Sequence, residues 1–88
     1  MDSYVLEVCS GGAAWQVEPH STNEIDLEKI AKKIVSSGWK CTLENRLCYT
    51  FSGDVNLTLF PSGKLLVKTS DRNIANKIAK FHIDDWLS

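Results

Sequence analysis

The segment from residue 55 to residue 69 constrains the fold more than any other part of the chain. Residues 55–60 alternate between apolar and other side chains, residues 64–69 are rich in apolar side chains, and Pro61-Ser62-Gly63 lies between them. A three-residue loop in which Gly63 takes the left-handed conformation would join the two segments as an antiparallel hairpin. One face of this hairpin is then purely apolar and consists of Val55, Leu57, Leu59, Leu65 and Val67. We predict that this face lies against the core.

The opposite face of the same hairpin mixes polar, charged and apolar side chains. Antiparallel sheets commonly have one face on the core and the other left uncovered. We therefore expect this face to stay open and to carry any binding site. Its residues form three cross-strand pairs, which are Asn56 with Lys68, Thr58 with Leu66, and Phe60 with Lys64.

Two segments before the hairpin, residues 39–43 and 47–51, predict further antiparallel strands because their connections are short. The loop at 52–54 decides where Tyr49 points. A three-residue loop aligns Tyr49 with Leu57, and Leu47 with Leu59, in the core. A two-residue loop would instead place Tyr49 on the open face. We favour the first register because it buries three apolar side chains.

The N-terminal part of the chain predicts one or two more strands. Residues 4–9 are rich in β-formers, and Ser10-Gly11-Gly12 ends this segment. Residues 13–17 are either the second strand of a hairpin or an irregular arm.

A first amphipathic helix precedes residue 38. Ser21 and Glu24 have the spacing of a capping box, and Gly38 stands where a helix stop is expected. The apolar stripe of this helix recurs at helical spacing and consists of Leu27, Ile30, Ala31, Ile34 and Val35. Trp39 follows the stop and is expected in the core.

A second amphipathic helix begins at Ser70 or Asp71, which are both good N-caps. Residues 83–88 either continue this helix or fold back. Trp15 and Trp86 are either buried or available for stacking on bases. The apolar face of the helix consists of Ile74, Ala75, Ile78, Ala79, Phe81 and His82.

These elements predict a single α+β domain over residues 1–88. Its two layers are a curved antiparallel sheet of five to six strands and two helices that cover one face of that sheet. The expected order of elements is β-α-β-β-β-β-α, with a further strand near the N-terminus.

The hairpin and its flanking helices resemble one repeat of the TATA-box-binding protein family. The shared features are an apolar strand that ends in Phe60, the Ser-Gly-Lys turn at 62–64, a second apolar strand, and a helix on either side. The resemblance covers residues 22–83. It extends to small single-repeat proteins of archaeal type that have this fold and no established function.

The resemblance implies a role in contacting DNA. In that family two repeats form a saddle whose concave sheet opens the minor groove, and the Phe before the turn unstacks a base step. The wedge position falls on Phe60, and the family's contact positions fall on Thr58, Leu66 and Lys68. Asn56 is added because it shares their face. This chain has one repeat, so it forms a saddle only as a dimer, and it has Lys68-Thr69 where the family has Thr-Gly.

The charge of the chain favours a protein partner over nucleic acid. Ten Lys and Arg residues against eleven Asp and Glu residues give a net charge of -1, whereas wrapping DNA needs several phosphate contacts. We expect a non-enzymatic binding module whose open face contacts a protein partner or a second copy in a homodimer. The alternative is weak DNA or RNA binding by the same face, either as a dimer or with single strands.

Catalytic, metal and cofactor sites are not predicted. The two histidines, His20 and His82, are far apart, and His82 is expected to be partly buried and hydrogen-bonded. The three cysteines, Cys9, Cys41 and Cys48, lack paired metal-ligand spacing. Their odd number, with no export signal and no membrane-spanning apolar run, favours a reducing cytoplasm. Cys9 and Cys41 are expected to be small buried hydrophobes.

Overall fold

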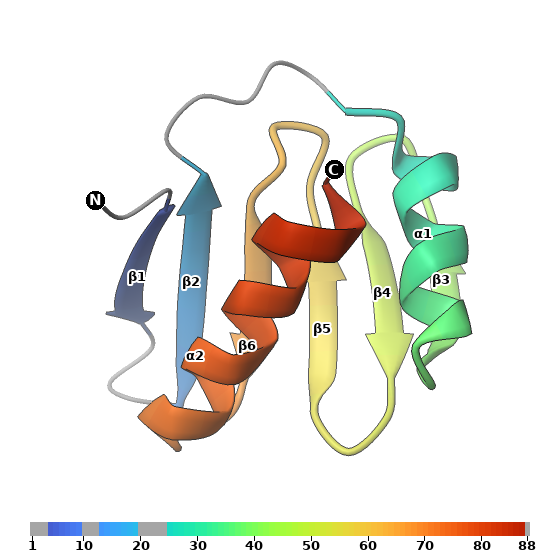
Figure 1. The fold of residues 1–88 in the computed structure, drawn as a ribbon. Helices are drawn as coiled ribbons and strands as arrows, with labels where there is room; N and C mark the ends of the chain where they lie inside the picture. The colour runs from blue at the N-terminus through green and yellow to red at the C-terminus, as the bar shows by residue number, and fades with distance from the viewer. Residues whose placement is uncertain (1–3, 10–12, 20–24, 88) are drawn as a thin grey trace.

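The computed structural model describes residues 4–9, 13–19 and 25–87, which form an α+β domain (Figure 1). A six-stranded antiparallel sheet has the order β1-β2-β6-β5-β4-β3. Its strands are β1 (Tyr4–Cys9), β2 (Ala14–Pro19), β3 (Lys40–Glu44), β4 (Tyr49–Ser52), β5 (Asn56–Leu59) and β6 (Leu65–Lys68). The helices are α1 (Leu27–Ser36) and α2 (Arg72–Phe81), and a π-helical turn, His82–Trp86, extends α2. The predicted fold class is confirmed at this level.

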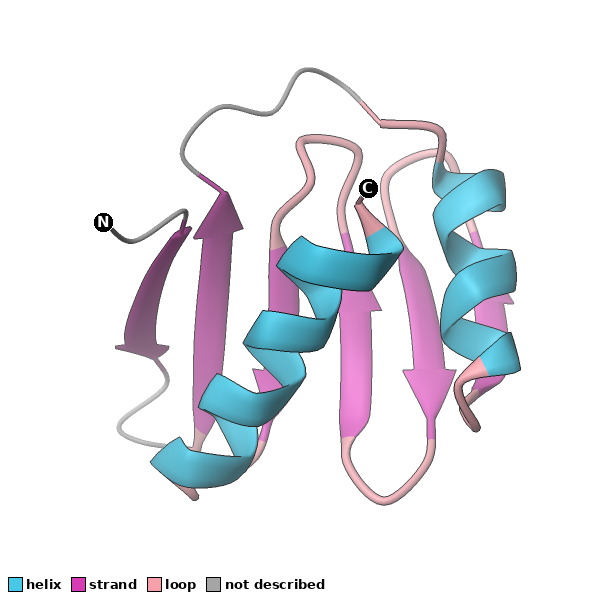
Figure 2. Cartoon of the chain, viewed as in Figure 1, coloured by secondary structure: helices cyan, strands magenta, loops and turns pink. Residues whose placement is uncertain are grey.

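Both helices lie on one face of the sheet (Figure 2). α1 covers the β3–β4 side, while α2 runs diagonally in front of β2, β6 and β5 (Figure 1). The chain crosses from β2 at one side of the sheet to α1 and β3 at the other before it returns strand by strand to β6. The other face of the sheet carries no helix among the described residues, so it is open as predicted. Neither helix has the length and apolar character that crossing a membrane requires, for the part of the chain that is described.

The β5–β6 hairpin has the predicted register. Its pairs are Asn56 with Lys68, Leu57 with Val67, Thr58 with Leu66 and Leu59 with Leu65. The loop closes as expected: the Phe60 amide donates to the Lys64 carbonyl at 2.9 Å, and the Gly63 amide donates to the Phe60 carbonyl at 3.0 Å. Gly63 has a φ of 92°, the left-handed conformation that a side chain would strain.

The core lies between the apolar face of the sheet and the two helices. Four of the five residues predicted on the apolar face of the last hairpin are almost fully buried, which confirms its sidedness, and Val55 is partly buried in the loop before β5. The almost fully buried residues of the sheet face are Val17, Phe51, Leu57, Leu59, Leu65 and Val67. The helices contribute Ile30, Ala31 and Ile34 from α1, and Ala75, Ile78 and Ala79 from α2.

β4 lies in a different register from the one we predicted. Tyr49 does point to the core side, but it pairs with Leu59 and not with Leu57. The prediction that Leu47 pairs with Leu59 in the core is wrong, because Leu47 is 75% exposed. Its amide donates to the Asn45 side chain at 3.0 Å, so Leu47 belongs to the turn before β4.

The connection from β4 to β5 explains this two-residue shift. The loop is residues 53–55 and not 52–54. The indole of Trp39 packs against Gly53, and its Nε1 donates to the Val55 carbonyl at 2.7 Å. Trp39 is partly buried against the core, as expected.

The N-cap of α1 is Asp26 and not the Ser21 of the expected capping box. The Asp26 carboxylate accepts from the amides of Glu28 and Lys29 at 3.1 and 3.3 Å, which satisfies the free amides of the first turn. The proposed box lies in residues 20–24, outside the described residues.

The other helix ends agree with the sequence. Gly38 ends α1 with a φ of 114°, and the amide of Gly38 donates to the Val35 carbonyl at 3.1 Å. The amide of Trp39 reaches the Ile34 carbonyl at 3.4 Å, which completes a Schellman motif. Asp71 caps α2, accepting from the amide of Asn73 at 2.8 Å.

The C-terminal residues continue α2 and bury Trp86. The amide of Leu87 donates to the His82 carbonyl at 2.9 Å, a π-helical bond. Trp86 is 1% exposed, donates from Nε1 to the Ser37 hydroxyl at 3.0 Å, and meets Trp39 edge to face at 5.5 Å between ring centroids. Trp86 therefore joins the two helices and cannot stack on a ligand.

The N-terminal segments are both strands, so the alternative of an irregular arm at 13–17 is wrong. Trp15 is partly buried against the core. Cys41 is half-buried and not fully buried as expected. Burial and then the neighbouring Glu44 carboxylate raise the pKa of its thiol. The side chain of Cys9, the turn at 10–12 and His20 lie outside the described residues.

Candidate interaction surface on the open face of the sheet

Strand pairing places Asn56, Thr58, Leu66 and Lys68 on the face of the sheet that the helices leave uncovered. Phe60 and Lys64 follow on the same face by alternation, since a backbone hydrogen bond joins them at the end of the hairpin. Asn56 and Lys68 are exposed, Phe60, Lys64 and Leu66 are half-buried, and Thr58 is 7% exposed. Strand pairing adds neighbours from β2 and β4, because Gln16 pairs with Leu66 and Thr50 pairs with Thr58. We call this surface the open face and define it by Gln16, Thr50, Asn56, Thr58, Phe60, Lys64, Leu66 and Lys68.

The middle of the open face is a row of uncharged side chains. It crosses four strands in the order Gln16, Leu66, Thr58 and Thr50. Thr58 is nearly buried because Leu66 and Thr50 flank it on both sides. The hydroxyls of Thr42 and Thr50 are 2.7 Å apart, which extends the row to β3. A partner that covers this row would not have to displace water from charged side chains of this protein.

One end of the open face carries an aromatic ring beneath a cation. The Lys64 ammonium lies 4.8 Å from the centroid of the Phe60 ring, a cation–π contact. Both side chains flank the Gly63 turn. The chain's own lysine therefore lies over the ring, and the part of Phe60 that stays exposed is available to a partner.

The turn is held from the helix side by His82. Its Nε2 lies 2.6 Å from the Gly63 carbonyl oxygen. Since a carbonyl can only accept, Nε2 carries the proton. Burial lowers the pKa of His82 to about 4, and the bond to Gly63 opposes this shift only in part. At neutral pH a neutral His82 thus holds the turn that presents Phe60 and Lys64.

The other end of the open face contains a shallow hollow of about 250 Å³. Polar side chains dominate its lining, which consists of Thr42, Thr50, Phe51, Ser52, Asn56, Leu57 and Lys68. An exposed lysine and amide at the rim of a hydroxyl-lined depression can accept hydrogen-bonding groups of a partner.

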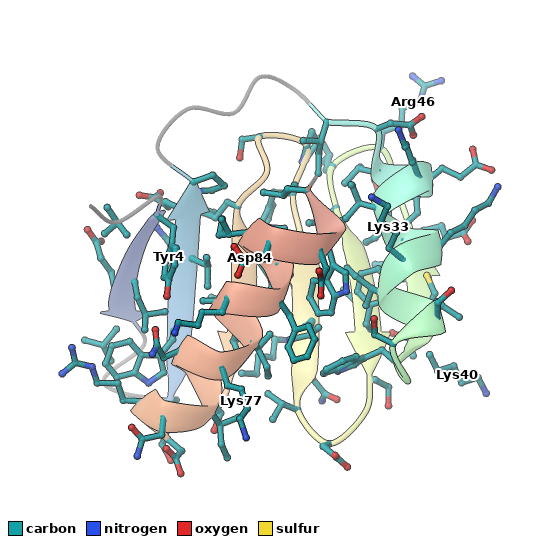
Figure 3. The ribbon with its side chains drawn as sticks, viewed as in Figure 1. Tyr4, Lys33, Lys40, Arg46, Lys77 and Asp84 are labelled. Atoms are coloured by element: carbon teal, nitrogen blue, oxygen red, sulfur yellow. The ribbon has the colours of Figure 1, made fainter. Side chains whose placement is uncertain are left out.

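Charges of both signs surround the uncharged row. Glu7 pairs with Gln16, and Gln16 donates to the Glu18 carboxylate at 2.8 Å, so the β1–β2 side is acidic. Lys64 and Lys68 lie on the β6 side, and Lys40 lies exposed at the β3 edge (Figure 3).

Sequence reasoning missed the members of the open face that come from β2 and β4. Thr50 was missed because its pairing with Thr58 depends on the register of β4, which was predicted wrongly. Gln16 was missed because the pairing of β2 with β6 joins residues about fifty positions apart. The alternation of Trp15, Gln16 and Val17 was the signal that could have found it.

Comparison of the chain with protein-family models, with curated proteins and with solved structures finds no match. The open face must therefore be interpreted from its own chemistry. It offers an apolar and hydroxyl-rich centre, one aromatic ring, and a rim of ammonium, amide and carboxylate groups. Such a surface can bind by burial and hydrogen bonding.

Proposed function

We propose that this protein is a non-enzymatic protein-binding module that contacts its partner through the open face. One observation carries the proposal: among the described residues no helix covers one face of the antiparallel sheet, while Leu66 and Phe60 stand half-buried on it. Protein interfaces combine a less polar centre with a polar rim. The row from Gln16 to Thr50 supplies such a centre, and the surrounding charges supply the rim.

The charges of this surface favour a protein over a nucleic acid. Lys40, Lys64 and Lys68 are offset by Glu7 and Glu18 on the β1–β2 side, whereas affinity for DNA or RNA depends on several unopposed phosphate contacts. A partner protein whose surface carries charges of both signs can be complementary to the basic side and to the acidic side of this face. Weak nucleic-acid binding, by a dimer, remains the alternative function, and the exposed part of the Phe60 ring is the feature that favours it.

We also propose that the fold is that of a single TATA-box-binding-protein-like repeat. The order of elements from β2 onward supports this proposal: a strand, α1, four consecutive strands and α2. The position of Phe60 and Lys64 around the turn, on the uncovered face, agrees with it as well. Under this proposal Phe60 takes the wedge position of the family, and one chain supplies half of a saddle.

Affinity capture with matched variants tests the function. Nuclease-treated cell extract is passed over the immobilised wild-type protein, over Leu66→Lys and over Val35→Lys. Val35 is the control because it is 45% exposed on α1, away from the open face. We expect a protein retained by wild type and Val35→Lys and released by Leu66→Lys, and the purified protein should then shift open-face amides in NMR spectra. Equal retention by all three would contradict the proposal.

An NMR titration tests the alternative function, which is nucleic-acid binding. Labelled protein is mixed in turn with duplex DNA, single-stranded DNA and RNA at physiological ionic strength. We expect no saturable shift of open-face amides. Saturable shifts at Phe60 and Lys68 that disappear steeply with added salt would replace the protein partner with a nucleic acid.

A further inference from the structure

The two edges of the sheet are built differently. On the β3 edge the register shifts between Cys41 and Leu43, which marks a bulge, and Lys40 is exposed. Bulges and lysines on edge strands hinder pairing with another chain. β1 has neither: its register with β2 runs without a shift over all six residues, and Glu7 is its one charged residue.

β1 is an edge strand whose position is fixed by its contacts with the rest of the domain. It pairs with β2 alone and ends the sheet within the described part of the chain (Figure 1). Tyr4 donates from its hydroxyl to the Asn76 side chain at 2.8 Å, which ties the start of β1 to α2. Leu6 packs on the core, while Val8 remains 52% exposed. A strand fixed in this way loses little conformational entropy when another strand pairs with its outer edge.

We propose that the β1 edge is a self-association interface, at which β1 of a second copy pairs antiparallel about a twofold axis and joins the two sheets. This interface is independent of the proposed function, because it uses the edge of the sheet and leaves the open face of each copy accessible.

The side chains of β1 favour a second copy as the occupant. In a continuous sheet, paired residues point to the same face. The register centred on Leu6 places Leu6 opposite its own symmetry mate, Tyr4 opposite Val8, and Val5 opposite Glu7. Every pair is then apolar or contains a single charge. The register centred on Glu7 would place two carboxylates opposite each other, which is unfavourable. The first register is therefore the predicted one.

The size of the full chain and contacts between copies in solution test this proposal. Light scattering over a concentration series should show a monomer–dimer equilibrium. In a mixture of ¹³C-labelled and unlabelled protein, isotope-filtered NMR should show contacts between the Tyr4 ring of one copy and the Val8 methyls of the other. A protein that stays monomeric at millimolar concentration would overturn the proposal.

Two matched substitutions test whether the dimer forms at the β1 edge and not elsewhere on the molecule. Val8 and Leu43 are 52% and 48% exposed on the opposite edges of the sheet. We expect Val8→Lys to raise the dimer dissociation constant about tenfold, because each dimer contains the change twice at cross-strand pairs, and Leu43→Lys to leave it unchanged. Intermolecular contacts at Leu66 and Phe60, with no effect of Val8→Lys, would overturn the edge interface and would support self-association through the open face.

Discussion

His82 and Gly63 are joined by a hydrogen bond of 2.6 Å between the imidazole Nε2 and the carbonyl oxygen of the turn. The bond connects the end of the α2 layer to the loop that carries Phe60 and Lys64 on the opposite side of the sheet. His82 is fully buried, and its Nδ1 makes no hydrogen bond within the described residues. The turn of the open face therefore depends on a histidine that must stay neutral.

Acid should destabilise the protein through this histidine. The pKa of His82 is lowered from 6.5 to about 4 in the folded state. Between these values the unfolded chain binds a proton that the folded protein does not. Protonation of His82 therefore costs no stability above pH 6.5, and the folded state loses stability relative to the unfolded state as the pH falls toward 4. We expect a loss of roughly 3 kcal/mol in the free energy of unfolding over this window, measured by urea unfolding.

The variant His82→Gln isolates this effect from the titration of carboxylates. A glutamine amide can donate to the Gly63 carbonyl but does not titrate. The variant should lose less stability than wild type between pH 6.5 and pH 4. Identical slopes for the two proteins would show that His82 is not the group responsible.

Gly53 should not tolerate a side chain. A Cβ at this position would lie 2.6 Å from Cδ1 of Trp39, whose indole is fixed by its bond to Val55 and its contact with Trp86. We expect Gly53→Ala to lower the free energy of unfolding by about 1–3 kcal/mol in a denaturant titration. Ser52→Ala, one residue earlier on an exposed side chain, is the control. Equal stabilities for the two variants would mean that Trp39 is free to move.

The helix caps make a further prediction about stability. Asp26→Ala and Asp71→Ala should each cost about 1 kcal/mol, because each removes the acceptor for two amides of the first helical turn. Ser21→Ala should be close to neutral by the same denaturant measurement. If Ser21→Ala costs as much as Asp26→Ala, the N-terminus of α1 is capped from a different residue.

Local patterns in the sequence determine the parts of the fold that could be predicted. The β5–β6 register follows from a loop in which Gly63 alone suits the left-handed position, so the alternation on both sides defines the two faces. Asp71 and Gly38 mark helix ends because their roles depend on the neighbouring residues only.

The parts that could not be predicted depend on contacts between distant residues. Val55 continues the alternation of β5, yet its carbonyl accepts from Trp39, and this places Val55 in the loop and moves β4 by two residues. The bond from Trp86 to Ser37 joins residues that no periodicity relates. Six of the eight residues of the open face were predicted, and the other two, Gln16 and Thr50, were not, because they come from β2 and β4.

Substitution of Phe60 should lower the affinity for the partner more than it lowers the stability of the fold. Its ring is half-buried beneath the Lys64 ammonium, so Phe60→Ala should lower the free energy of unfolding by about 1–2 kcal/mol, less than for a core phenylalanine. Affinity for the captured partner should fall at least about tenfold, as for an aromatic anchor in an interface. Phe81→Ala is the matched control, because Phe81 is 49% exposed on the helix side. Calorimetric titration of both variants checks the difference, and an equal loss of affinity would argue against the open face.

The most direct measurement of the central claim is the map of amide shifts in labelled protein titrated with its purified partner. The account predicts that the largest shifts occur in β5, β6 and the turn at Gly63, with α1 and α2 unchanged. Shifts concentrated on the two helices, with Thr58, Phe60 and Leu66 unaffected, would contradict it.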